Sequence, residues 1–264
     1  MKRYLIVNAD DFGQEYGINR GVIFAHEHGI VTSASLMVRW PAATEAANYA
    51  RQHPGLSLGL HVDLGEWVYR AGEWMPRSEV VPENDPAAVA EEVVRQLATF
   101  RELVGRDPAH LDSHQHVHRE EPVRSILRQV ARELAVPLRG RARRVRYCGD
   151  FYGQTAEGCP FPEGISLRNM LRIVAGLRPG TTELGCHPGL GDDLPLPYRH
   201  ERTTEVRILC DKRVRMALDE KGVELRSFAV TRGGGQRSET ASIAGRTTGE
   251  RIGTGSIKGH VDRR

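Results

Sequence analysis

The sequence predicts an α/β fold in which parallel strands form a barrel or a near-barrel. Short apolar runs alternate with longer stretches of helical periodicity, which is typical of parallel strands joined by crossover helices. About seven such runs are present, a number that suits a barrel better than a small open sheet. The length of 264 residues also suits one α/β barrel.

Apolar runs bounded by turn residues mark the predicted strands. Strands of a parallel sheet are buried on both faces, so their sequences are continuously apolar rather than alternating. The runs lie at residues 4–7, 31–38, 56–62, 110–113, 144–147, 182–186 and 224–230.

Helices are predicted between these runs, where apolar residues recur at helical spacing. Pro41 and Pro86 open two of them, because the fixed φ of proline suits a first helical turn. Gly29 ends the first helix. The helices are predicted at residues 16–27, 41–51, 86–104, 122–134, 167–177 and 203–221. Residues 65–85 fit neither the strand pattern nor the helix pattern, and we predict that they form an excursion from the barrel rather than a helix or a strand.

The last 33 residues differ from the rest of the chain. Residues 232–264 are rich in Gly, Ser and Thr and hold few large apolar side chains. Such a segment cannot bury enough surface to offset the entropy lost on ordering. We therefore predict a single barrel domain over 1–231 and a disordered basic tail over 232–264.

The charge distribution argues against a nucleic-acid partner. The tail holds seven Lys/Arg and three Asp/Glu, a net of +4, so a total of +3 leaves −1 for residues 1–231. A nucleic-acid binder needs a basic face to neutralise phosphates. The arginine-rich run at 139–146 is explained as well by a solvated loop or a strand edge.

The sequence also predicts no contact with a membrane. No run approaches the 18 consecutive apolar residues of a spanning helix. The apolar start of the chain stops after Val7, which is too short for the core of a signal peptide. The expected location is the cytoplasm.

Polar clusters able to do chemistry follow four of the predicted strands. They are NADDFG at 8–13, GLHVD at 59–63, HLDSHQHVH at 110–118 and GCHPG at 185–189. The carboxyl ends of parallel strands form the functional face of such folds, so these clusters are expected to converge.

The residue types in these clusters indicate metal-assisted hydrolysis. One carboxylate of Asp10 and Asp11 can ligate a cation while the other stays free as a base. With His61 and His114 this gives a mixed oxygen and nitrogen site for a divalent metal that activates water. His187 can carry a proton to a leaving group. Taken singly, the Asp pair can instead cap a turn, and His61 can be a satisfied core histidine.

Taken together, these segments resemble the YdjC/ChbG family of carbohydrate deacetylases. GIVTSASLMV at 29–38 also matches, and the similarity runs over about residues 1–230 in the right order. The resemblance implies a distorted (β/α) TIM-like barrel and removal of acetyl groups from N-acetylated amino sugars such as chitooligosaccharides. It also implies a divalent cation, Mg²⁺ first and Zn²⁺ or another transition metal as alternatives, and often a homodimer.

The resemblance also implies a role for each of these residues. Asp11, His61 and His114 match the metal ligands, Asp10 the general base and His187 the general acid. A cationic His187 would need a neighbouring carboxylate to keep it protonated. His118 and Asp112 are additional candidates; in related polysaccharide deacetylases an H-x-x-x-H pair, the spacing of His114 and His118, binds the metal.

Aromatic residues in the excursion suggest where a sugar binds. Trp67 and Trp74 lie at 65–85, and aromatic faces commonly support sugar rings. We expect a substrate-covering loop there; the alternative is a loop anchored by buried tryptophan.

Three other functions are compatible with parts of the pattern. A barrel phosphoesterase of the polymerase-and-histidinol-phosphatase type also uses H-x-H motifs, but would carry the first of them after strand one, where this chain has Asp10 and Asp11. A deacetylase of a lipid-linked or nucleotide sugar keeps the chemistry and changes the substrate. A sugar-binding protein without activity would not need a free base and acid beside a metal.

Overall fold

The fold was obtained as a computed structural model that describes residues 2–70, 72–191, 194 and 198–231. The predicted disordered tail at 232–264 lies outside the described residues. The strands are β1 (Arg3–Phe12), β2 (Ser33–Leu36), β3 (Ser57–Val62), β4 (Gly65–Arg70), β5 (Glu73–Glu79), β6 (Leu111–Ser113), β7 (Val145–Cys148), β8 (Gly180–Cys186) and β9 (Val223–Leu225).

Helices separate most of these strands in the sequence. They are α1 (Tyr16–His28), α2 (Ala43–Gln52), α3 (Pro86–Val104), η1 (His114–Arg119), α4 (Val123–Glu133), η2 (Pro162–Ile165), α5 (Leu167–Gly176), α6 (Arg199–Leu209), α7 (Lys212–Glu220) and α8 (Phe228–Thr231). Among them α1 packs against α6, α2 and α4 against α3, and α5 against α7.

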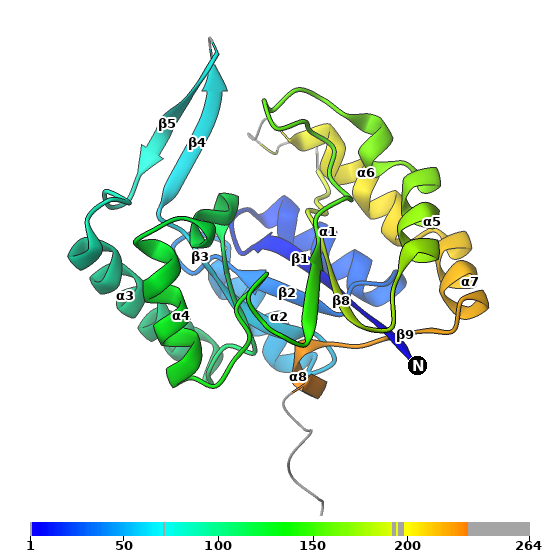
Figure 1. The fold of residues 1–264 in the computed structure, drawn as a ribbon, viewed down its shortest axis with the longest axis horizontal. Coiled ribbons are helices and arrows are strands. Elements are labelled where there is room, and N and C mark those ends of the chain that lie inside the picture. The colour runs from blue at the N-terminus through cyan, green and yellow to red at the C-terminus, as the bar shows by residue number, and fades with distance from the viewer. Residues whose placement is uncertain (1, 71, 192–193, 195–197, 232–264) are drawn as a thin grey trace, which may run out of the picture. The chain divides into compact units, whose positions relative to one another are not determined.

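Seven strands form the main sheet, and all of their pairings are parallel. The order is β6-β3-β2-β1-β8-β7, with β9 paired to the first residues of β1 (Figure 1). Every carboxyl end therefore lies at the same edge, as the sequence predicts.

The sheet is strongly curled. β6 and β1 are three places apart in the order, which in a flat sheet would separate them by about 14 Å. One guanidinium nitrogen of Arg139 nevertheless lies 2.7 Å from Asp10 of β1 and 2.8 Å from Asp112 of β6. The expectation of a distorted (β/α) barrel is confirmed: the parallel strands form a half-barrel surrounded by helices.

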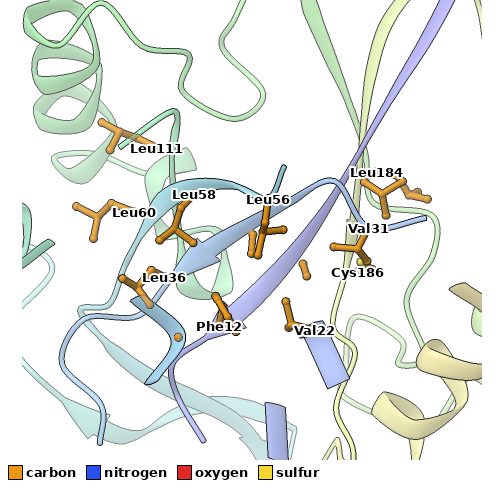
Figure 2. Packing of buried hydrophobic residues seen from close by; sticks show 14 of the residues in the cluster. Phe12, Val22, Val31, Leu36, Leu56, Leu58, Leu60, Leu111, Leu184 and Cys186 are labelled. Atoms are coloured by element: carbon orange, nitrogen blue, oxygen red, sulfur yellow. The ribbon is translucent and has the colours of Figure 1, made fainter. Parts of the chain in front are cut away.

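The two faces of β1 show how the inside of the barrel is built. Leu5, Val7 and Ala9 point outward into the core between the sheet and the helices, part of which is drawn in Figure 2. Ile6 points inward and packs with Val145 and Phe228, forming an apolar floor. Since side chains alternate along a strand, Asn8 and Asp10 lie above that floor, toward the mouth.

Three predicted elements differ from the structure. The excursion at 65–85 contains the antiparallel hairpin β4–β5, because Trp67, Val68 and Tyr69 favour a strand. The single helix expected at 203–221 is two helices, since the Asp211 side chain caps α7 by accepting from the N–H of Arg213. The last strand, expected at 224–230, is the short β9 followed by α8.

Within the described ranges, every helix is too short or too polar to cross a bilayer.

Candidate active site

Asp11 stands at the centre of the site, near the end of β1. Its Oδ1 lies 3.4 Å from Nε2 of His61 and 3.2 Å from Nδ1 of His114. The backbone of Asp11 has φ of 63°, in the left-handed region that non-glycine residues rarely adopt. Such strain costs about 1–3 kcal/mol and collects at functional sites.

These three side chains can share one ion. One ligand atom from each of Asp11, His61 and His114 lies within 4.8 Å of the others. Nδ1 of His61 is hydrogen-bonded at 2.7 Å to Asp112 Oδ1, which leaves Nε2 directed at Asp11. A carboxylate that orients a ligand histidine in this way is common around metals. Asp112 would thus orient His61 for an ion held by the first group, although Asp10, His61 and Asp112 form a second group that could hold an ion.

Neighbouring charges set the protonation of His61 and Asp11. Burial lowers the pKa of His61, but Asp112 and Asp11 outweigh burial and raise it to about 10. Burial raises the pKa of Asp11, and Arg202 and His114 reverse this and hold it well below the ordinary value. A metal ion that binds Nε2 of His61 would therefore displace a proton from this imidazole.

Asp10 is held by an arginine. Arg139 donates from its two terminal nitrogens to Oδ2 and Oδ1 of Asp10, at 2.6 and 2.7 Å. Asn8 donates to Oδ1 at 2.8 Å. Burial raises the pKa of Asp10, but Arg139 outweighs it and lowers the pKa below the ordinary value. Asp10 is therefore an ionised, fixed carboxylate.

Arg139 was missed by the sequence interpretation, which treated the whole run at 139–146 as solvated. That holds for the other arginines of the run, which are exposed, but Arg139 is buried and also bonds Glu183 at 2.7 Å. The sequence did contain a signal for Arg139, because apolar residues precede it up to Leu138. In the structure, Leu138 forms a parallel β-bridge with Leu111 of β6. Arg139 thus follows a strand-like segment, as the other site residues do.

His187 faces Asp10 from the end of β8. Its Nε2 lies 3.8 Å from Asp10 Oδ2, and its backbone N–H donates to the buried Glu205 of α6. Burial lowers the pKa of His187 to about 4, although Asp10 and Asp11 act in the opposite direction. The expectation that a carboxylate keeps this imidazole cationic is wrong, because burial and the nearby arginines outweigh the carboxylates.

Glu205 and Arg202 were also missed, since both belong to a helix that reads as charged and solvated. Arg202 donates to Oδ2 of Asp11 at 2.6 Å. Glu205 accepts from the hydroxyl of Tyr198 at 2.7 Å, and burial raises the pKa of Glu205 to about 8. No periodicity in the sequence separates these inward residues from their exposed neighbours.

The structure places His118 outside the group of three ligands. Its Nδ1 lies 2.7 Å from the hydroxyl of Ser113, and the same hydroxyl accepts from its backbone N–H at 3.0 Å. The H-x-x-x-H spacing does not bring both histidines to one ion, because η1 is not a continuous helix: Gln115 and His116 have positive φ.

A cavity of about 960 Å³ opens above these residues. The site side chains form its floor, and its walls include Trp67 and Tyr69 of β4, Tyr147 of β7 and Tyr152. Trp67 is half-buried and donates from Nε1 to Glu83 at 3.1 Å. The side chain of Trp74 lies outside the described part of the structure.

Gly21 of α1 lets the loop after His187 approach the helix. A Cβ at this position would overlap the backbone of Gly189. We expect Gly21→Ala to cost about 1–3 kcal/mol of stability, because the loop must move. Gly176→Ala in α5 is the control, since a Cβ there meets nothing within 4 Å. Equal urea midpoints for the two variants would contradict this account of Gly21.

Known proteins were compared with the whole chain. A carbohydrate deacetylase from Geobacillus stearothermophilus is 33% identical over 250 residues, covering 86% of this chain and 98% of that protein. A chitooligosaccharide deacetylase from Serratia marcescens is 32% identical over 264 residues, covering 86% and 99%. A solved structure from Enterococcus faecalis, provisionally assigned to cellobiose-phosphate cleavage, matches at 25% identity with a TM-score of 0.71, covering 88% of this chain and 99% of that one.

One protein family accounts for these similarities. The model of the family described as YdjC-like protein matches residues 4–220, which include all of Asp10, Asp11, His61, His114 and His187. The match covers most of the chain, and the relatives align over nearly their full length. The chain belongs to the YdjC-like family.

Proposed function

We propose that this protein hydrolyses the N-acetyl group of an acetylated amino sugar with the help of a divalent metal ion. One observation supports the chemistry above all others: Asp11, His61 and His114 offer three ligand atoms within 4.8 Å of one another, beside a second, separately held carboxylate. The two deacetylases that resemble the chain over 86% of its length support the substrate class.

The donor set fits the ion that this chemistry needs. One carboxylate and two imidazoles leave open positions for substrate and water. When bound, a divalent cation polarises the acetyl carbonyl and lowers the pKa of a neighbouring water. Imidazole ligands suit zinc and other transition ions, whereas Mg²⁺ prefers oxygen ligands throughout. We therefore propose a transition metal ion ahead of Mg²⁺.

Asp10 acts as the general base in this proposal. Arg139 and Asn8 fix its carboxylate and keep it ionised, so it can accept a proton from the attacking water. Asp10, His61 and Asp112 could also share an ion, but the two bonds from Arg139 to the oxygens of Asp10 favour the role of base over that of ligand.

His187 delivers the proton to the amine that leaves. Its pKa of about 4 makes the imidazole neutral at pH 7, so it has to gain the proton during the reaction. Asp10 lies 3.8 Å away, close enough for a small movement to pass on the proton taken from water. The proton thus travels from water through Asp10 and His187 to nitrogen.

The cavity suits a sugar of more than one ring. Its volume of about 960 Å³ lies at the upper end of the usual range for ligand pockets. Trp67 and Tyr69 on one wall and Tyr152 on another offer flat apolar faces with polar edges. We propose an N-acetylated oligosaccharide as the substrate. Dimer formation, a cytoplasmic location and the lack of a nucleic-acid partner stay predictions from the sequence.

Acetate release tests the proposal. The protein, stripped of metal by a chelator, should release acetate from N-acetylglucosamine oligomers only after Zn²⁺, Co²⁺, Mn²⁺ or Mg²⁺ is returned. Loss of the ion should lower the rate by more than about 100-fold, since such ions contribute several kcal/mol to the transition state. Phosphate release from sugar phosphates under the same conditions, without acetate release, would favour the phosphoesterase alternative instead.

A further inference from the structure

Gln115 joins the metal-binding loop to the β4–β5 hairpin. The side-chain oxygen of Gln115 accepts from the backbone N–H of Trp67 at 2.8 Å, and its side-chain nitrogen donates to the backbone carbonyl of Trp67, also at 2.8 Å. The amide therefore satisfies both main-chain groups of one strand residue, as a neighbouring strand would. Gln115 is the residue next to the candidate ligand His114.

The hairpin has a reason to depend on this bridge. Trp67 lies opposite Pro76, but its N–H and C=O point outward to Gln115, so this is a non-hydrogen-bonded pair of the hairpin. The hairpin extends away from the sheet (Figure 1). It is also tied at its root, where Gly65 bonds Asp63 and Val80 bonds Leu64, and through Nε1 of Trp67, which donates to Glu83 at 3.1 Å. Gln115 thus holds the hairpin partway along β4, beside the cavity.

The loop depends on the bridge as well. Gln115 and His116 have φ of 49° and 59°, two successive non-glycine residues in the left-handed region. Each is a strained conformation that persists only where the surroundings hold it. The two bonds of Gln115 help to hold this turn, and Tyr147 holds His116 through a contact of 3.3 Å. Without the bridge the turn can relax and move His114.

We propose that Gln115 is a positioning residue that couples cation binding to the sugar-binding wall of the cavity. This inference rests on the proposed function. A cation that fixes His114 would also fix Gln115 and so hold Trp67 and Tyr69 in place. By reciprocity, a sugar held on the hairpin strengthens cation binding by the same factor.

Two measurements test the coupling without any assay of activity. In the wild type, Zn²⁺ should slow hydrogen exchange of the β4 backbone, where the Trp67 N–H donates to Gln115. In Gln115→Ala this protection should disappear, and the calorimetric Kd for Zn²⁺ should rise at least about tenfold, as for other residues that support a ligand. The matched control is Gln129→Ala, an exposed glutamine of α4, which should behave as wild type in both.

Comparing Gln115→Gly with Gln115→Ala distinguishes the effect of the bridge from that of the backbone strain. Glycine adopts positive φ freely, so this variant loses the bridge and the strain together. The coupling predicts no β4 protection in this variant, and a Kd for Zn²⁺ between those of wild type and Gln115→Ala, because the turn has no strain left to release. Zn²⁺ affinity at the wild-type level in Gln115→Gly or Gln115→Ala, or wild-type Zn²⁺ binding without β4 protection, would overturn the inference. A wild type that binds no cation would overturn the proposed function with it.

Discussion

Replacing Arg139 with methionine is expected to lower the free energy of unfolding by about 3–5 kcal/mol. The guanidinium is buried and bonds three carboxylates, Asp10, Asp112 and Glu183. Methionine fills a similar volume but leaves those groups in the barrel without their cation. Removing one partner of a buried ion cluster is far costlier than losing a surface pair, because the remaining charges stay desolvated.

Urea unfolding of a matched pair of variants measures this effect. Arg141→Met lies two residues further along the same run and is exposed, so its stability should stay within about 0.5 kcal/mol of wild type. Arg139→Lys should fall between, since one ammonium group cannot reach all three carboxylates in the fork geometry of arginine. A loss in Arg139→Met no larger than in Arg141→Met would show that the barrel does not depend on this cluster.

Much of the fold could be predicted because parallel strands are apolar throughout. The runs at 4–7, 56–62 and 182–186 all lie within strands of the sheet or overlap them, and their order gave the barrel class. The hairpin β4–β5 was missed because the described residues of β5 are exposed and those of β4 are mostly half-buried, so neither strand shows a clear apolar periodicity. The division between α6 and α7 depends on a single cap, Asp211, which a continuous helical pattern conceals.

The site also contains residues that the sequence could reveal and residues that it could not. Asp10, His61 and His187 could be found because each lies at the end of a recognisable strand, where parallel topology collects side chains. Arg202 and Glu205 could not, since a helix turned toward the barrel mouth looks like any charged helix. Neither the position of a residue nor its motif tells which arginine bonds which aspartate. Arg139 bonds Asp10 and Arg202 bonds Asp11 because the curl of the sheet brings these side chains together.

Asp10→Asn is expected to reduce kcat for acetate release by about 10²–10⁴-fold while leaving cation affinity within a few-fold of wild type. The amide keeps the shape of the carboxylate and can still accept a bond from Arg139, but it cannot take a proton from water. The ligand atoms of Asp11, His61 and His114 belong to other side chains, so cation binding should persist. KM should change little, since a base acts mainly in the transition state.

Measuring kcat, KM and the Kd for Zn²⁺ on the same preparation distinguishes a base from a ligand. Asp219→Asn, an exposed aspartate of α7, is the control and should match wild type in all three.

If Asp10→Asn loses cation binding in proportion to activity, Asp10 belongs to the ligand group, and its bonds to Arg139 must open when the ion enters. If kcat stays within a factor of a few of wild type, another group deprotonates the water. A large fall in kcat at full cation occupancy requires that Asp10 acts as a base near the ion without being its ligand. The two hydrogen bonds from Arg139 to Asp10 would hold the carboxylate in that position.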